Sequence, residues 1–152
     1  MASDQTADVT DLVVIRRTVP ATVTRAFDAW TDPASIARWA APGTSVITHA
    51  AVDLRVGGRF EQHMRAANGF ERRVAGTYLE ISAPYRLVYT WRWELPPEDV
   101  ESRVTVEFRD IGSATEVVVT HALLGDDTSR GNHAKGWNGC LDRYVELFAA
   151  AI

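Results

Sequence analysis

Cysteine is almost absent from this sequence of 152 residues, in which Cys140 is the only one. A single cysteine cannot form an internal disulfide, so the fold has to be stabilised by its packed core. The N-terminal segment MASDQTADVTDL is polar and acidic, and it lacks the basic and then apolar layout of a signal peptide. These features predict a cytoplasmic protein with a disordered tail over residues 1–9 and a single domain over residues 10–152.

Surplus basic charge and long hydrophobic runs are also lacking. The chain has 16 Lys and Arg against 20 Asp and Glu, which gives a formal net charge of -4. Nucleic acids and anionic lipids both favour a basic protein face. A helix that crosses a bilayer needs about 20 consecutive apolar residues, and no run approaches that length. We therefore predict neither a nucleic-acid partner nor a membrane partner.

Familiar cofactor and catalytic motifs are missing as well, since the sequence contains no GxGxxG, P-loop, GxSxG or HExxH. None of the four histidines pairs with another ligand at metal-binding spacing on one predicted element. His133 and Cys140 share one helix but lie about 10 Å apart along its axis, too far to hold one ion. Cys140 falls on the buried side of that helix, where a thiol is a small apolar residue. The sequence predicts neither a cofactor nor a metal site.

What the sequence does contain is a clear change of hydrophobic period. Residues 12–19 are rich in β-branched side chains and predict a first strand, and residues 45–123 hold six more segments with a period of two, joined by short turns. Between them, residues 23–41 keep a helical period, interrupted where Asp32-Pro33 starts a second short helix. A last helix from about Thr128 to Ala150 would be roughly 35 Å long. This order predicts an α+β fold with a curved antiparallel sheet of about seven strands and a C-terminal helix across its concave face.

Strand alternation sorts the side chains by face and makes the inner face large and aromatic, with few polar members. Such a face is typical of a small-molecule cavity and equally of a filled core. His121 is the most informative polar residue, because its parity places it among inward valines. The candidate ligand-binding residues are Trp39, Phe60, Gln62, Met64, Tyr89, Trp91, Val106, Phe108, His121, Trp137, Cys140 and Leu141.

Two glycines interrupt the helical pattern of HAKGWNGCLDRYVELF. Gly136 and Gly139 flank Trp137, and each costs about 1 kcal/mol of helix stability relative to alanine. They thin one end of the helix, so that either a neighbouring element or a ligand can come close to its backbone. The sequence leaves both interpretations open.

Several segments together resemble a known family. AFDAWTDPASIARWAAP, VDLRVGGRFEQHMR, GTYLEISAPYRLVYTWRWE and HAKGWNGCLDRYVELF are similar in content and order to the SRPBCC (START-like) superfamily. Within it they resemble the branch of homologues of the activator of the heat-shock chaperone ATPase. The resemblance covers about Leu12 to Phe148. It implies a helix-grip fold with a cavity between sheet and helix, but it implies no particular reaction.

Three functions follow as hypotheses. The first is a cofactor-free protein that binds a small apolar or aromatic molecule in the cavity. The second is an enzyme of the cyclase, dehydratase or hydrolase kind, with His121 and an inward Tyr or Gln as the acid–base pair. The third is a chaperone ATPase regulator or interaction module, which needs an exposed patch outside the cavity. A homodimer is compatible with the sequence, which selects no interface.

Overall fold

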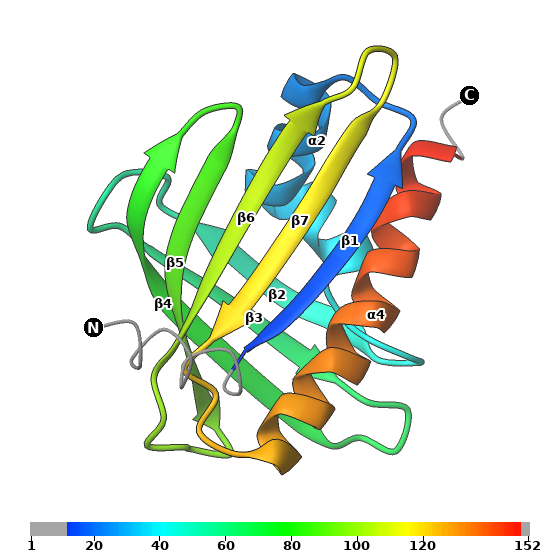
Figure 1. Cartoon of the computed structure of the whole chain (residues 1–152). Helices are drawn as coiled ribbons and strands as arrows, with labels where there is room; N and C mark the ends of the chain where they lie inside the picture. The colour runs from blue at the N-terminus through cyan, green and yellow to red at the C-terminus, as the bar shows by residue number, and fades with distance from the viewer. Residues whose placement is uncertain (1–11, 150–152) are drawn as a thin grey trace.

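The computed structural model describes residues 12–149, which form one antiparallel sheet and three helices (Figure 1). The strands are β1 (Val13–Val19), β2 (Val46–Val52), β3 (Arg59–Arg65), β4 (Glu71–Ser82), β5 (Arg86–Leu95), β6 (Ser102–Asp110) and β7 (Thr115–Ala122). The helices are α2 (Val23–Thr31), α3 (Pro33–Trp39) and α4 (Asp127–Ala149). This is the predicted α+β helix-grip fold. The predicted tail over residues 1–9 and the predicted end of the last helix at Ala150 lie outside the described residues.

The sheet has the strand order β1-β7-β6-β5-β4-β3-β2, and each neighbouring pair is antiparallel. Consecutive strands from β2 to β7 form the predicted meander, and β1 adds to its far side with Val13 opposite His121. The sheet curls strongly, so that β2 and β3 pass behind β6 and β7 in Figure 1. Helix α4 packs beside β1 on one side and against α3 on the other, and α3 in turn packs against β2.

Each helix begins at a residue whose side chain accepts a hydrogen bond from a free backbone N–H of the first turn. Thr22 accepts from the N–H of Arg25 at 3.3 Å, and Asp32 accepts from the N–H of Ser35 at 3.1 Å, next to Pro33. Helix α4 begins in the same way, because Asp126 accepts from the N–H of Ser129 at 2.8 Å. The three caps therefore account for where the helices begin along the chain.

The core under the C-terminal half of α4 is filled. Leu141 and Tyr144 are 0% exposed and Phe148 is 4% exposed. The Tyr144 hydroxyl donates to the carbonyl of Ala26 at 2.6 Å, which ties α4 to α2. Strand residues of alternating parity face this helix, as the sequence predicts, and Val106 and Phe108 are buried here.

Arg143 on α4 packs against the loop after α3. Its guanidinium donates to the carbonyl oxygens of Ala41 at 2.6 Å and Ser45 at 2.9 Å, and also to that of Gly43. A guanidinium offers five donors in a fixed fork, which suits several carbonyl oxygens presented by one loop. The side chain therefore fastens the loop that borders the N-terminal half of α4.

The two glycines of α4 have different surroundings. A Cβ atom at Gly139 would lie 3.3 Å from Cβ of Pro42 and 3.4 Å from the backbone N of Gly43, so this glycine permits a close approach of the loop. A Cβ atom at Gly136 would meet nothing within 4 Å. Tight packing therefore explains Gly139, whereas Gly136 borders open space.

This difference predicts unequal outcomes for two alanine substitutions. Gly136→Ala should raise the free energy of unfolding by up to about 1 kcal/mol, because alanine favours the helix and meets no neighbour. Gly139→Ala should gain clearly less, since Pro42 has to move to accept the methyl group. Urea unfolding of the two variants measures both changes. An equal gain at both positions would contradict the assigned packing.

Candidate functional site

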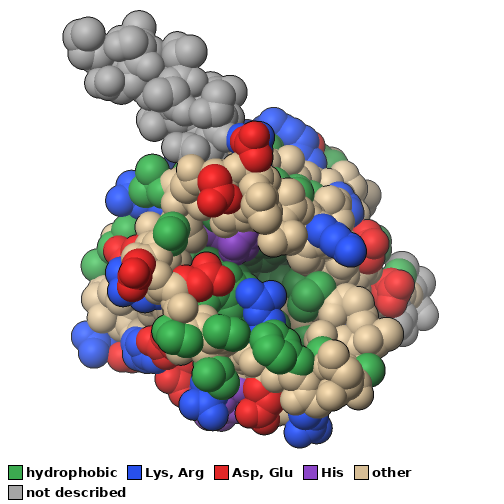
Figure 2. Space-filling view, turned by 90° about the horizontal axis from the view of Figure 1, so that it is seen from below, with side chains coloured by type: hydrophobic (Ala, Val, Ile, Leu, Met, Phe, Trp, Pro, Cys, Tyr) green, Lys and Arg blue, Asp and Glu red, His purple; other side chains and the backbone are tan. Residues whose placement is uncertain are grey.

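A cavity of about 160 Å³ opens between the concave face of the sheet and the N-terminal half of α4. Strands β3 to β5 supply one wall, with Phe60, Met64, Tyr78, Tyr89 and Trp91. The opposite wall comes from α4, with His133, Gly136, Trp137 and Cys140. Helices α2 and α3 close the inner end with Trp30, Ile36 and Trp39. Figure 2 shows the hollow from below, surrounded by hydrophobic side chains.

All five tryptophans of the sequence line this cavity. Trp30 stacks on Trp137 with ring centroids 6.0 Å apart and an interplanar angle of 18°. Trp91 lies 5.6 Å from both Trp137 and Trp93. The open volume therefore lies among packed aromatic rings.

His121 is buried beside the cavity and is not part of its lining. Its Nδ1 accepts from the indole N–H of Trp137 at 2.9 Å. An indole can only donate, so His121 carries its proton on Nε2, which lies 2.7 Å from the Ser102 hydroxyl oxygen. That hydroxyl donates onward to the carbonyl of Trp91 at 3.1 Å. Both ring nitrogens are therefore occupied by the protein itself.

The environment of His121 also keeps it neutral. Burial, and secondly the nearby His133, hold the pKa of His121 well below its usual value of about 6.5. Burial likewise lowers the pKa of His133, against the opposing effects of the Ser129 carbonyl and Glu98. His133 donates from Nδ1 to Ser129 O at 2.7 Å, and its Nε2 accepts from Trp93 at 3.2 Å.

Cys140 is likewise uncharged in the folded protein. Burial raises the pKa of its thiol to about 12, although Arg143 opposes this, so the thiolate is absent at neutral pH. The Sγ atom donates to the carbonyl of Ala40 at 3.2 Å. Cys140 contributes a small apolar surface to the cavity, as the sequence predicts for a buried cysteine.

The predicted site residues divide into two groups. Those that line the cavity are Trp39, Phe60, Gln62, Met64, Tyr89, Trp91, Trp137 and Cys140. Those that are buried without lining it are Val106, Phe108, His121 and Leu141. The second group lies on β6, β7 and α4, where the core is filled. Strand parity gives the inward face but does not distinguish its filled end from its open end.

Sequence reasoning did not select Arg72 and His133, both of which line the cavity. Arg72 lies two residues before Val74 on β4 and therefore shares the inward face with it, a parity signal that was available. Its guanidinium packs over Trp93, 4.0 Å from the ring centroid. His133 lies one helical turn before Trp137 and so points to the same side of α4. Both residues stand where the cavity continues into a wider outer groove that also includes Glu98 and Asp126.

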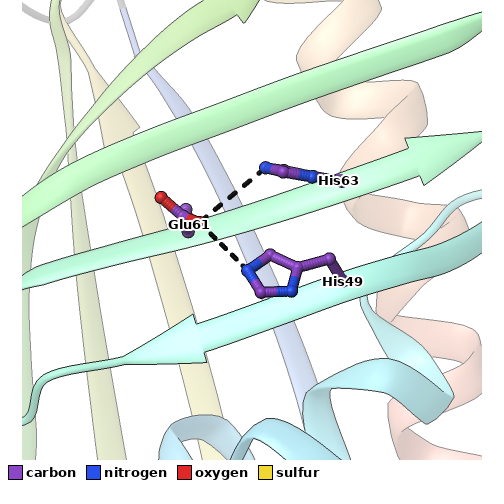
Figure 3. Close-up of side chains that lie close together, drawn as sticks. All are labelled: His49, Glu61 and His63. Carbon is purple, nitrogen blue, oxygen red and sulfur yellow. Dashed lines mark hydrogen bonds and ion pairs between the residues drawn. The ribbon is translucent and has the colours of Figure 1, made fainter.

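A separate cluster lies on the other face of β3, away from the cavity (Figure 3). The carboxylate of Glu61 lies 3.0 Å from His49 Nε2, 3.9 Å from His63 Nε2 and 3.3 Å from Arg59 Nε. Burial raises the pKa of Glu61, but hydrogen bonds from His49 and Arg59 outweigh it and hold the pKa below its usual value. One ligand atom from each of His49, Glu61 and His63 lies within 4.8 Å of the others, so the trio could hold a divalent metal ion. A search along single elements overlooks it, because His49 comes from β2 and the other two from β3.

A curled antiparallel sheet that holds a long C-terminal helix over an aromatic cavity defines a START-like helix-grip protein. The family model described as "Activator of Hsp90 ATPase homolog 1-like protein" matches residues 20–149, and the chain belongs to this family. The resemblance seen in the sequence is thereby confirmed.

Solved structures agree with this assignment. An AHSA1-like protein from Aeromonas hydrophila is 31% identical, with 92% of this chain and 93% of that chain covered and a TM-score of 0.74. A protein from Chromobacterium violaceum is 24% identical, with 91% and 97% covered and a TM-score of 0.83. An AHSA1 protein from Silicibacter pomeroyi is 21% identical, with 93% and 99% covered and a TM-score of 0.84. None of the curated proteins matches the chain. Within residues 12–149, no helix is long and apolar enough to cross a membrane.

The neutral state of His121 makes stability depend on pH with a defined sign. The unfolded chain binds a proton on this residue below about pH 6.5 and the folded chain does not, so stability falls as the pH drops below that value. Each such group contributes a slope of up to about 1.4 kcal/mol per pH unit. His121→Asn retains an acceptor for Trp137 and should lower stability at pH 7.5. It should also make the slope between pH 6.5 and 5.5 shallower. Urea unfolding across this range measures the slope, and an unchanged slope in the variant would contradict the buried neutral histidine.

Proposed function

We propose that this protein binds a small apolar or aromatic molecule in the cavity between the sheet and α4. The observation that carries the proposal is the cavity of about 160 Å³ with a mostly aromatic and apolar lining. Ligand sites in proteins are concave, mostly apolar and equipped with few polar groups. An apolar cavity of roughly 150 Å³ is large enough to take up benzene, so the volume suits one aromatic ring with a short substituent at the mouth.

The size of the cavity also sets the expected affinity. A ligand with about ten non-hydrogen atoms gains on the order of 0.4–0.7 kcal/mol per atom, which corresponds to dissociation constants between about 10 μM and 1 mM. Rigid tryptophan walls favour this binding, because few side chains lose freedom when a ring enters.

The hypothesis of acid–base catalysis at His121 receives less support from the geometry. A general acid or base has to come within hydrogen-bonding distance of the reacting group. Both nitrogens of His121 are engaged by Ser102 and Trp137, and the residue is 0% exposed. Binding is therefore the function that the site supports best.

Tryptophan fluorescence can test whether a ligand enters the cavity. Because all five tryptophans line the cavity, a ring that enters should change the intrinsic fluorescence in a saturable way. Phenylacetamide is a suitable neutral probe, because its size matches the cavity. Gly136→Leu places a side chain in the open space beside α4 and should weaken binding at least tenfold. Gly131→Leu is the matched control, since Gly131 is exposed on the same helix and lies outside the lining.

Saturable quenching of the wild type and of Gly131→Leu, but not of Gly136→Leu, is the expected pattern. No saturable change below about 10 mM, or equal binding by Gly136→Leu, would contradict the proposal.

A further inference from the structure

Two residues of the cavity lining each carry a buried hydrogen-bond donor without a partner. Among residues 12–149, the buried side-chain nitrogens that lack a partner are Nε of Arg72 and Nε1 of Trp91, and both residues line the cavity. Both atoms donate and neither accepts. A buried donor without a partner is costly, so natural structures satisfy nearly all of them, and the exceptions call for an explanation.

Trp91 differs from the other tryptophans in this respect. The indole N–H groups of Trp30, Trp39, Trp93 and Trp137 all donate to protein acceptors, at distances between 2.9 and 3.2 Å. Trp91 is only 7% exposed, so its unpaired N–H lies inside the protein and away from bulk water. The fold satisfies every indole of the cavity except this one.

Among the described residues, Arg72 is the only charged one that lines the cavity, and none of those lining residues carries a carboxylate. Its guanidinium carbon lies 4.0 Å from the centroid of the Trp93 ring, a cation–π contact that uses none of the N–H donors. No described residue forms an ion pair with Arg72, whereas Arg17, Arg59 and Arg86 each pair with a carboxylate. Glu98 and Asp126 line only the outer groove that Arg72 shares, and neither pairs with it.

We infer that the cavity ligand is a carboxylic acid with an apolar or aromatic body. Its carboxylate binds the guanidinium of Arg72 at the mouth, and an oxygen atom accepts from Nε1 of Trp91. Hydrogen bonds between a charged donor and a charged acceptor are the strong ones, and a guanidinium fits a carboxylate with two parallel bonds. This inference rests on the proposed function and specifies the chemical class of the ligand.

The experiment compares two probes of nearly equal shape, phenylacetate and phenylacetamide. The wild type should bind phenylacetate roughly 10- to 100-fold more tightly than phenylacetamide, because only the former brings an anion to Arg72. Arg72→Met keeps the length of the side chain and removes the charge, so it should abolish this preference while phenylacetamide affinity changes less than threefold. Trp91→Phe should weaken phenylacetate binding several-fold.

Arg73→Met is the matched control. Arg73 is the next residue on β4, is exposed and points to the opposite face, and its replacement changes the net charge by the same amount. This variant should keep the preference for phenylacetate. Circular dichroism and thermal unfolding establish that each variant is folded before its affinity is measured by tryptophan fluorescence and calorimetry.

The possible outcomes separate the two proposals. Equal affinity for both probes in the wild type, or an equal loss in Arg72→Met and Arg73→Met, overturns the carboxylate site and leaves cavity binding intact. Failure of both probes to bind saturably overturns both. A preference for phenylacetate that disappears only in Arg72→Met supports the site.

Discussion

The hydrogen bond from the indole of Trp137 to His121 is the interaction on which the rest of the structure depends. It joins the middle of α4 to β7 with a donor–acceptor distance of 2.9 Å, and both residues are buried. It sets the tautomer of His121, which in turn positions Ser102 and the backbone of β5. It also holds the Trp137 ring in place, so that Trp30 can stack on it from the side of α2. Helix, sheet and the two short helices thus meet at one indole.

Trp137 also marks the border between two halves of the interior. On its C-terminal side α4 presents Leu141, Tyr144 and Phe148, and the space below is filled. On its N-terminal side α4 presents Gly136, which has no side chain, and His133, whose ring accepts a hydrogen bond from Trp93. The sheet opposite contributes large rings that cannot close the remaining gap. The cavity is therefore a consequence of which residues α4 places at its N-terminal half. Arg72 and Trp91, which each carry a donor without a partner, line the same cavity.

The sequence predicted much of the fold, because its signals are local. Period and turn chemistry placed the strands and helices, and parity placed Phe60, Tyr89 and Trp91 on the inner face. The site required information that is not local. Parity treats Val106 and Tyr89 alike, although one faces the filled half and the other the open half. Arg72 had the inward parity of Val74, but whether a carboxylate meets it depends on the packing of α4. The trio of His49, Glu61 and His63 depends on strand pairing with an irregular register between Ile47 and His49.

The central claim is that an unpaired donor of Trp91 faces a cavity that a small acid enters. Indole N–H resonances in two-dimensional proton–nitrogen NMR test it most directly, as phenylacetate is added to the ¹⁵N-labelled protein. We expect the Trp91 resonance to move furthest, and downfield, because this group gains an acceptor. The Trp137 resonance should move less, since its bond to His121 is already made. A Trp91 resonance that stays in place at saturating phenylacetate would contradict the account.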